Sequence, residues 1–519
     1  MSTKLTNEKK ASNQNGTKRL VFAVLSIVLE VAFWFLLFNE LNKYAVIINI
    51  ISRLAAIVLV LVLYNQKITA AMRTPWIILI MSFPIFGTFM YLLIGANLKI
   101  KKMRKTIERI DKKLLPLLPD NDSAQTSLKR KDPAAANISS YIRRNTGYPV
   151  YDDSDIMYFA EAKDGLEAQL AELAKAKKFI FMEYHAIQNE RSWARIRKVL
   201  EDRVNAGVEV RVFYDDMGSI GFINLDFAKD LESRGIKCCV FNPFSHGMNF
   251  FLNNRDHRKI TVVDGKVGFT GGYNLADEYF GLTHPYGMWK DTGVRIEGPA
   301  VKSLTATFLE MWNASNPDCH DDFKKYLPDI PYAQKEKNAF IVPYADNPMD
   351  DIQAGEDVYI NMVSKANDYC YFITPYLILS DELAHALRVA AMRGVDVRII
   401  TPGIPDKKIV YSLTRSFYAA LVDSGVRIFE WTPGFCHAKM SIADGKMATC
   451  GTINLDFRSL YHHFENGCFF SNCKAVSDMK ADFDRTFEEC REVTEDYKNI
   501  KFSPRMLILM LLRLFSGLM

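Results

Sequence analysis

Three long apolar runs open the chain and predict helices that cross a membrane. They occupy residues 20–38, 45–64 and 76–95. The first two runs contain one charged residue each and the third contains none, and each is close to the roughly 20 residues that a bilayer crossing needs. Pro84 and Gly87 interrupt the third run, so a kinked or re-entrant element is an alternative to a third crossing. We therefore expect residues 1–98 to form a membrane anchor of two to three hydrophobic helices.

A dense basic cluster follows the third run. It consists of Lys99, Lys101, Lys102, Arg104, Lys105, Arg109, Lys112 and Lys113. Positive charge beside a membrane segment is typical of the cytoplasmic side, where it faces anionic lipid. The N-terminal tail is also basic, which leaves the number of crossings and the side of the N-terminus open. We expect a multi-pass protein of the cell membrane whose body is cytoplasmic.

The segment between the anchor and the body is predicted to be a connector. Residues 99–146 would form a basic juxtamembrane segment and linker. Residues 121–136 are polar, and we expect them to be a loose part of that linker.

Beyond residue 150, polar and apolar stretches alternate as they do in α/β units. Residues 206–213 read as a helix end, a glycine cap and a buried strand, and residues 393–400 repeat this pattern closely. The chain therefore contains an internal repeat of α/β type.

Around two histidines the repeat is in strict register, with an offset of 180 positions from His257 to His437. The matched residues are His257, Lys259, Asp264, Gly265, Lys266, Gly271, Asn274 and Leu275 in the first copy, and His437, Lys439, Asp444, Gly445, Lys446, Gly451, Asn454 and Leu455 in the second. So long a period indicates a duplicated domain rather than a solenoid of short units.

We predict an α/β fold of two tandem domains that form a pseudo-dimer with one shared active site. The domains would span residues 147–345 and 346–500, followed by an apolar tail over residues 501–519. The tail could lie in the membrane interface or dock on the body of the protein.

Composition narrows the function only slightly. A net charge of +5 is too small to argue for nucleic-acid binding. The nine cysteines are scattered, odd in number and without the paired spacing of a structural zinc site. We expect free thiols, no metal and no cofactor.

The two copies of the pattern His-x-Lys-x-x-x-x-Asp suit phosphoryl chemistry. Residues i and i+2 of a strand point to the same face, so His257 projects together with Lys259, and His437 with Lys439. If two such strands meet across a pseudo-twofold axis, two imidazoles and two ammonium groups surround one phosphate. One imidazole can then attack phosphorus while the other protonates the departing alkoxide.

Each histidine also needs a partner that holds its far ring nitrogen and fixes the tautomer. Asp291 and Glu465, which follow the two motifs in the sequence, are the candidates for this role. Asp264 and Asp444 end the two motifs, and each precedes a glycine in an expected turn. We expect these two aspartates to stabilise the framework of the site rather than to contact substrate.

The motifs and the residues behind them resemble the phospholipase D superfamily, and within it the bacterial cardiolipin synthases. The resemblance rests on residues 257–264, 271–274, 289–292, 297–300, 374–376, 437–444 and 451–459. Together with the third apolar run and the apolar tail, it covers nearly the whole chain. It adds Gly272, Asn274, Thr452 and Asn454 as supporting site residues. Thr452 stands where many relatives carry serine, and it keeps a hydroxyl.

The resemblance implies that the partners of the protein are phosphatidylglycerol, its product cardiolipin and anionic membrane lipid, with no nucleic acid. One histidine would take the phosphatidyl group while glycerol leaves, and a second phosphatidylglycerol would resolve the phosphohistidine. By analogy His257 is the nucleophile and His437 the acid and base. The implied catalytic set is His257, Lys259, Asp264, His437, Lys439 and Asp444. The oligomeric state stays open.

Several alternatives use the same residues. A phospholipase D would pass the phosphatidyl group to water, and another transferase would pass it to a different alcohol such as ethanolamine. A nuclease of the superfamily is disfavoured by the three apolar runs, and a non-enzymatic scaffold by the intact motifs.

Overall fold

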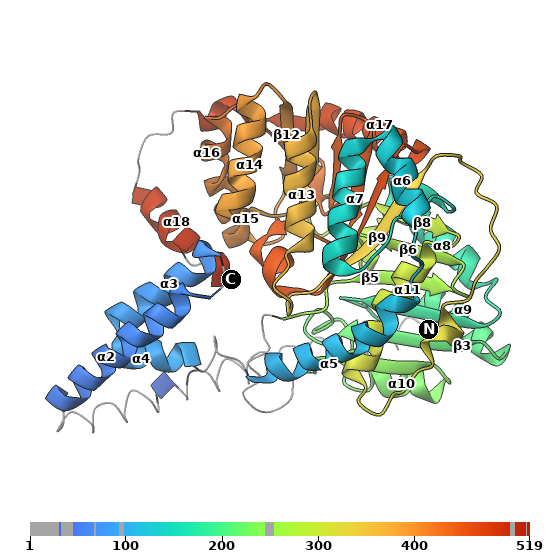
Figure 1. The fold of residues 1–519 in the computed structure, drawn as a ribbon, viewed down its shortest axis with the longest axis horizontal. Helices are drawn as coiled ribbons and strands as arrows, with labels where there is room; N and C mark the ends of the chain where they lie inside the picture. Colours follow the sequence, from blue (N-terminus) through green and yellow to red (C-terminus); the bar gives the residue numbers. More distant parts are fainter. Residues whose placement is uncertain are drawn as a thin grey trace.

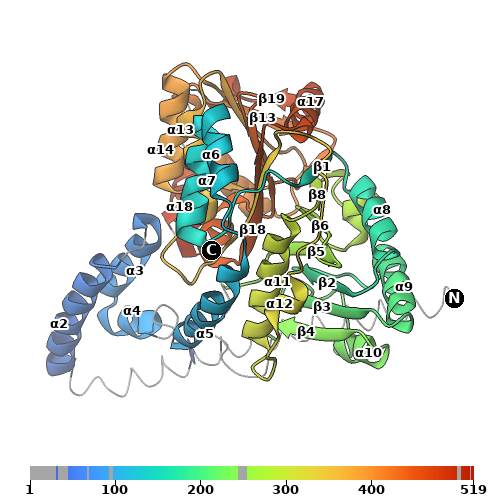
Figure 2. The same ribbon diagram turned by 45° about the vertical axis from the view of Figure 1, so that its right-hand side comes forward.

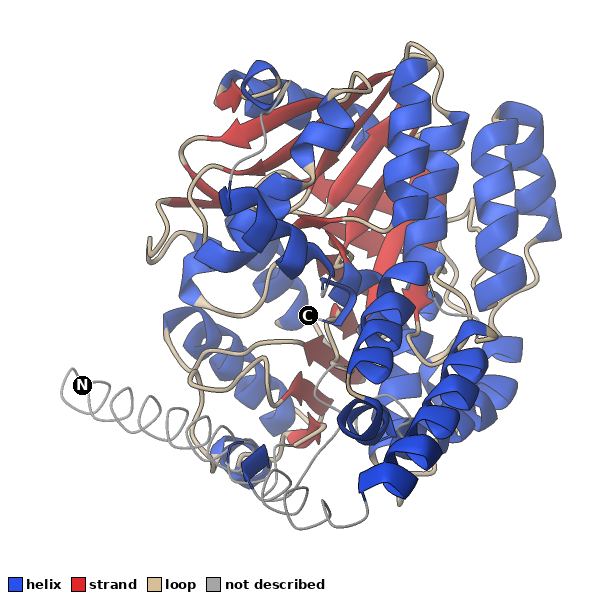
Figure 3. Ribbon diagram, turned by 90° about the vertical axis from the view of Figure 1, so that its left-hand side faces the viewer, coloured by secondary structure: helices blue, strands red, loops and turns tan. Residues whose placement is uncertain are grey.

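Two β-sheets lie at the centre of the molecule and helices cover them (Figure 1; Figure 3). The computed structural model describes residues 28, 31–32, 45–66, 69–92, 98–243, 254–498, 504–514 and 516–518. The second predicted run and residues 76–92 of the third fall within these ranges, whereas residues 93–95 and most of the first run, over residues 20–38, lie outside the described residues.

The first sheet has seven strands in the order β1-β8-β6-β5-β2-β3-β4. Their bounds are β1 (Asp155–Phe159), β2 (Phe179–Tyr184), β3 (Glu209–Asp215), β4 (Lys237–Phe241), β5 (Lys259–Val263), β6 (Val267–Gly271) and β8 (Gly293–Glu297). The strands β2, β3 and β4 pair in parallel, and β2 pairs antiparallel with β5. All six residues of β2 are buried, as expected for a central strand that is covered on both faces.

Helices pack on both faces of the first sheet (Figure 2). The helices α8 (Ala162–Leu173), α9 (Arg191–Asn205) and α10 (Phe227–Ser233) cover one face, and α11 (Val301–Ser315) covers the other. The short helix α12 (Phe323–Tyr326) follows α11. Twelve of the fifteen residues of α11 are buried because this helix packs against both sheets.

The second sheet repeats this plan and adds one edge strand, in the order β19-β13-β12-β10-β15-β16-β18-β9. Its strands are β9 (Phe340–Asp346), β10 (Tyr369–Ile373), β12 (Asp396–Pro402), β13 (Arg427–Trp431), β15 (Met440–Ala443), β16 (Met447–Gly451), β18 (Glu465–Ser471) and β19 (Cys490–Glu492). Its helices are α13 (Ala354–Lys365), α14 (Asp381–Met392), α15 (Lys408–Ser416), α16 (Tyr418–Val422) and α17 (Lys474–Glu488). The predicted tandem α/β architecture is confirmed. Because β9 belongs to the second sheet, the predicted boundary between residues 345 and 346 falls inside a strand.

The two halves share one hydrophobic core and exchange main-chain hydrogen bonds. A continuous cluster of buried side chains runs through both sheets. The short strand β7 (Met288–Lys290) of the first half pairs in parallel with β14 (Gly434–Cys436) of the second. Another short pair, β11 (Leu377–Ile378) with β17 (Leu455–Asp456), lies within the second half.

The predicted loose linker is wrong, because residues 98–146 form packed helices. These are α5 (Leu98–Leu114), α6 (Asp122–Lys131) and α7 (Pro133–Thr146). The carboxylate of Asp132 accepts from the N–H of Ala135 at 2.9 Å and caps α7. Ile138 and Ile142 are buried, and α7 lies beside α13 of the second half (Figure 1). The polar composition of this segment reflects its solvent-facing side.

The second and third apolar runs form a helical hairpin with a broken second arm. It consists of α2 (Ala45–Tyr64), α3 (Ala70–Ser82) and α4 (Pro84–Met90), so the predicted interruption at Pro84 is confirmed. Gly87 lies against the backbone of α3, where a Cβ would come within 2.6 Å of the Leu79 carbonyl oxygen. None of the described helices is both long enough and apolar enough to cross a membrane. The membrane crossings therefore stay a prediction.

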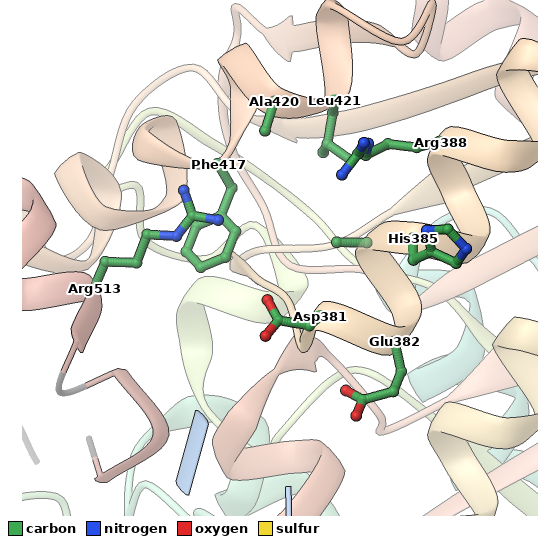
Figure 4. A pocket seen from close by; sticks show the side chains of 9 residues that line it. Asp381, Glu382, His385, Arg388, Phe417, Ala420, Leu421 and Arg513 are labelled. Carbon is green, nitrogen blue, oxygen red and sulfur yellow. The ribbon is translucent and has the colours of Figure 1, made fainter. Parts of the chain in front are cut away.

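The C-terminal segment docks on the body and reaches the N-terminal helices. α18 (Pro504–Leu514) packs against α15, and the turn η7 (Ser516–Leu518) packs against α3. The guanidinium of Arg513 lies 4.1 Å from the centre of the Phe417 ring (Figure 4). At Gly517 a Cβ would approach the Ala71 carbonyl oxygen to 2.7 Å, so a glycine fits this contact.

Candidate active site

The motif histidines lie at the boundary between the two halves. His257 comes shortly before β5, and His437 comes shortly before β15. The N–H of His257 donates to the carbonyl of Phe464 at 2.8 Å, and the N–H of His437 donates to the carbonyl of Lys290 at 2.8 Å. Each histidine is therefore held by the main chain of the opposite half.

Glu465 follows Phe464 in the sequence and places its carboxylate beside His257. Asp291 follows Lys290 and places its carboxylate beside His437. Nδ1 of His257 lies 2.8 Å and 2.9 Å from the two carboxylate oxygens of Glu465. Nδ1 of His437 lies 2.7 Å from Oδ2 of Asp291. Because both carboxylates are buried, they favour a proton on Nδ1, which places the lone pair of each neutral imidazole on Nε2. The structure thus pairs each predicted carboxylate with the histidine of the other half.

Gly272 and Thr452 occupy equivalent positions beside these two carboxylates. The Thr452 hydroxyl donates to Glu465. At Gly272 a Cβ would come within 2.1 Å of Oδ1 of Asp291, so no larger residue fits there. Oδ1 of Asp291 instead accepts from the N–H of Thr292 at 2.8 Å. Gly272 and Thr452 therefore both help to fix the position of the carboxylate that orients a motif histidine.

Both histidines open onto one cavity of about 640 Å³. Asn274 and Asn454 line the same cavity, together with aromatic and charged side chains from both halves. Nδ2 of Asn274 donates to the Tyr279 hydroxyl at 2.8 Å, whereas Oδ1 of Asn454 is buried and has no hydrogen-bond partner among the residues that the structure describes. A cavity of this size can hold a lipid headgroup.

The two walls of the cavity differ in chemistry. The ring of His437 lies among the rings of Tyr279, Trp289 and Phe435, at centroid distances of 5.2, 5.5 and 5.9 Å. The ring of His257 instead lies 5.0 Å from the ring of His185 and 5.5 Å from that of His463. Sequence reasoning missed both of these histidines. Their positions in the sequence were the one signal that could have indicated them, because His185 directly follows β2 and His463 precedes Glu465 by two residues.

The motif lysines are buried beneath the histidines. Nζ of Lys259 donates to the carbonyl oxygen of His257 at 2.6 Å, and Nζ of Lys439 lies 3.0 Å from Nε2 of His437. Burial lowers the pKa of Lys259 to about 7 and that of Lys439 to about 8, although Glu465 and Asp291 act in the opposite direction. Burial, followed by the charge of the lysines, also holds the pKa of both motif histidines well below its usual range. The free site therefore presents neutral imidazoles and lysines that titrate near neutrality.

Substrate capture is expected to weaken as the pH rises through about 7 to 8. The lowered pKa values mean that the free lysines lose their protons in this range, and a neutral amine does not attract a phosphate oxygen. Above this pH range we expect kcat/KM to fall by about tenfold per pH unit. We expect kcat to decline only at higher pH, since bound phosphate raises the lysine pKa. A Lys439→Arg variant, which stays charged, should show a shallower fall. A flat kcat/KM up to pH 10 would contradict this assignment.

Asp264 and Asp444 lie at the far ends of β5 and β15, outside the cavity lining. The carboxylate of Asp264 accepts from the N–H groups of Lys177, Lys178 and Phe179 at 2.7 to 2.9 Å. Asp444 accepts in the same way from residues 367–369 at 2.8 to 3.0 Å. This geometry favours the framework role for both aspartates, and their place in the implied catalytic set stays a prediction.

Replacing Asp264 with alanine is expected to lower the free energy of unfolding by about 3 kcal/mol, because three backbone donors lose a charged acceptor. The φ of +55° at this position adds strain in the variant. Asp264→Asn, which retains an acceptor and tolerates this conformation, should be stable and active. Thermal denaturation and product formation measured together would distinguish the roles. Full stability with lost activity in Asp264→Asn would place the carboxylate in the chemistry.

A second hollow lies beside α18, away from the motif histidines (Figure 4). Asp381, Glu382, His385 and Arg388 border it from α14, and Arg513 borders it from α18. Its charges are of both signs, Asp381, Glu382 and His385 are exposed, and no motif residue lines it. We therefore place the candidate active site in the cavity between the halves.

Comparison with known proteins gives related chains that match most of this one. A family model described as "Cardiolipin synthase, PLD-like domain" matches residues 170–312 and 359–487. A protein of Streptococcus mutans, named only as uncharacterized, is 42% identical over 84% of this chain and 94% of its own. Cardiolipin synthases of Oceanobacillus iheyensis and Geobacillus kaustophilus are 33% and 31% identical, over 81% and 86% of this chain and 88% of each relative.

A solved structure shares the fold. Phosphatidylserine synthase of Haemophilus influenzae aligns with 73% of this chain and 97% of its own, with a TM-score of 0.54. The sequence identity is 14%, so this likeness concerns the fold alone.

Proposed function

The chain belongs to the cardiolipin synthase family of phospholipase D-like proteins, and from this premise we propose that it makes cardiolipin from two molecules of phosphatidylglycerol. The observation that carries the proposal is the shared cavity. Two histidines open onto it, and each is oriented by a carboxylate of the opposite half. One phosphodiester between them has a nucleophile on one side and a proton donor on the other.

In the first step Nε2 of one imidazole attacks phosphorus. The N–P bond forms and the bond from phosphorus to the glycerol oxygen breaks. The extra proton that the other imidazole shares with its carboxylate passes from Nε2 of that imidazole to the glycerol oxygen. In the second step the hydroxyl of another phosphatidylglycerol gives its proton back to this imidazole while its oxygen displaces the histidine. Cardiolipin leaves and both histidines return to their starting state.

We assign His257 as the nucleophile and His437 as the acid and base. The partner of His437 supports this order, because burial raises the pKa of Asp291 to about 7, with Lys439 acting in the opposite direction. The pair of His437 and Asp291 can therefore hold and release a proton near neutral pH. Lys259 and Lys439 stabilise the charge on the phosphoryl oxygens, and Asn274 and Asn454 line the same space.

Burial of the histidines supports transfer over hydrolysis. His257 and His437 are each only 7% exposed. A phosphohistidine in such a site has limited access to water, so a positioned alcohol competes well for phosphorus.

We further propose that residues 1–98 attach the protein to the cell membrane in a multi-pass arrangement with the body in the cytoplasm. Large apolar side chains of α2 are exposed, among them Ile47 and Leu61 at 64% and 65%. The following helix α5 is rich in lysine and arginine, which suits an anionic lipid surface. The proposed substrate, phosphatidylglycerol, and the proposed product, cardiolipin, are themselves anionic lipids.

The proposal is tested by giving purified protein phosphatidylglycerol in vesicles and identifying the lipid product. Cardiolipin with an equal amount of released glycerol is expected. Phosphatidic acid as the sole lipid product would make the protein a hydrolase. Cardiolipin formed only when another phospholipid or alcohol is added would assign it a different acceptor or donor.

A further inference from the structure

The surroundings of His257 contain an imidazole that the proposed reaction does not use. His463 is 8% exposed and lines the cavity. Neither of its ring nitrogens has a hydrogen-bond partner within the described part of the chain. Leaving a buried polar group unpaired costs about 1–3 kcal/mol. Oε1 of Glu465 lies 3.6 Å from Nδ1 of His463, beyond hydrogen-bond distance, so both ring nitrogens are available to a ligand in the cavity.

His463 lies beside two other groups that can donate electron pairs. A carboxylate oxygen of Glu465, a ring nitrogen of His257 and a ring nitrogen of His463 all lie within 4.8 Å of one another. Oε1 of Glu465 is 2.8 Å from Nδ1 of His257 and 3.6 Å from Nδ1 of His463. Donors around tetrahedral zinc, with bonds of about 2.0–2.1 Å, are roughly 3.3 Å apart. The observed separations bracket that value.

The carboxylate of Glu465 is also oriented in a way that suits a metal ligand. The Thr452 hydroxyl donates to Oε2 of Glu465, and Oε1 lies between the two imidazoles. Bonds of this kind, made to the ligand and not to the ion, orient the donors of metal sites.

We propose that His257, His463 and Glu465 form a binding site for a transition-metal ion of the zinc class, and that the bound ion inhibits the enzyme. Two imidazole nitrogens and one carboxylate oxygen suit Zn²⁺ or Co²⁺, whereas Mg²⁺ and Ca²⁺ prefer oxygen donors. Three protein donors leave one position of the ion for water. The binding site is independent of the proposed function, but the inhibition rests on it.

Inhibition follows from the tautomer of His257. In the free enzyme the carboxylate keeps a proton on Nδ1, so Nε2 carries the lone pair. When the ion binds, the metal–Nδ1 bond forms, the Nδ1–H bond breaks, and the proton moves to Nε2. No proton is gained or lost in total and no electron is transferred. Nε2 then has no lone pair with which to attack phosphorus.

Within the described part of the chain, the second motif has no counterpart to this site. Around His437 the neighbouring rings are those of Tyr279, Trp289 and Phe435, none of which is a zinc ligand of the usual kind. Among the described residues, the three donors around His257 are the one group of this kind that could hold a metal ion. The ion is therefore expected to act on one histidine of the pair.

The test compares His463→Gln with His462→Gln in the full-length protein. His462 is the matched control, because it is the adjacent histidine and its Nε2 is already bonded to the carbonyl of Gly517 at 3.2 Å. Binding is measured with Co²⁺, whose visible spectrum reports tetrahedral nitrogen and oxygen ligation, and inhibition is measured with Zn²⁺ against Mg²⁺. Each variant is compared with its own rate in the absence of metal.

We expect wild type and His462→Gln to bind Co²⁺ tetrahedrally and to be inhibited by Zn²⁺ but not by Mg²⁺. His463→Gln should need at least about tenfold more Zn²⁺ for half-inhibition and should lose the Co²⁺ spectrum. A Co²⁺ spectrum that depends on His463 in a protein without transferase activity would support the site while the proposed function fails. Equal metal sensitivity in His463→Gln and wild type, or no Co²⁺ binding by wild type, would overturn the inference.

Discussion

Replacing either His257 or His437 with alanine is expected to lower cardiolipin formation by at least about 1,000-fold. The first variant loses the group that receives the phosphatidyl moiety, and the second loses the group that moves the proton. Both rings are buried in the same cavity, and the wall around each is built from different residues, so neither ring can replace the other. The measurement is lipid analysis of cells that produce each variant, followed by rates with purified protein.

The matched control is His385→Ala, since His385 is an exposed histidine on α14 outside this cavity. It should form cardiolipin at the wild-type rate. The double variant His257→Ala/His437→Ala should be no slower than the slower single variant, because the two residues act in one reaction sequence. Undiminished product from either single variant, at equal protein level, would remove that histidine from the mechanism.

The second large effect is expected from Glu465→Gln, which should lower kcat by about 100- to 10,000-fold. An amide has nearly the same shape as a carboxylate, but it can donate to Nδ1 and so favour the tautomer whose Nε2 carries the proton. It also provides no negative charge to stabilise the imidazolium. Asp291→Asn should act in the same way on His437, because Oδ2 of Asp291 holds its Nδ1 at 2.7 Å.

Kinetics and thermal denaturation together would separate this effect from unfolding. Glu430→Gln is the control, because Glu430 is a buried acid that pairs with Arg415 and does not line the cavity. It should retain kcat even if stability falls. A wild-type kcat for Glu465→Gln would mean that the carboxylate does not set the tautomer of His257.

Much of the architecture could be predicted because the sequence contains an internal repeat. The offset between His257 and His437 indicated a duplicated α/β domain, and the strand order of the second sheet repeats that of the first. The spacing of His257 and Lys259 predicted that their side chains lie together. Nζ of Lys259 does contact the carbonyl oxygen of His257, although His257 precedes β5 rather than belonging to it. Hydrophobic periodicity and internal repetition can both be read from a single sequence without knowledge of the structure.

The contacts between the halves could not be predicted, since they join residues far apart in the sequence. The parallel pair of β7 and β14 brings His437 to Asp291, and neither three-residue strand has a pattern of its own. An isolated parallel bridge between Asp256 and Phe464 brings His257 to Glu465. The helices α6 and α7 were missed for a related reason. The buried side chains of α7 pack against α13 and β9 of the second half, α6 packs against α7, and polar residues dominate the rest of both helices.

The crossed pairing of histidines and carboxylates has a consequence for how such an enzyme can evolve. Each half carries one of the two site histidines, but the carboxylate that orients it comes from the other half. A half expressed alone would therefore be inert, and an unfused ancestor would have worked as a homodimer. A homodimer must present the same surroundings twice. Fusion into one polypeptide removes that restriction, and the imidazole-rich wall around His257 and the aromatic wall around His437 are what unequal drift of two once-identical copies produces.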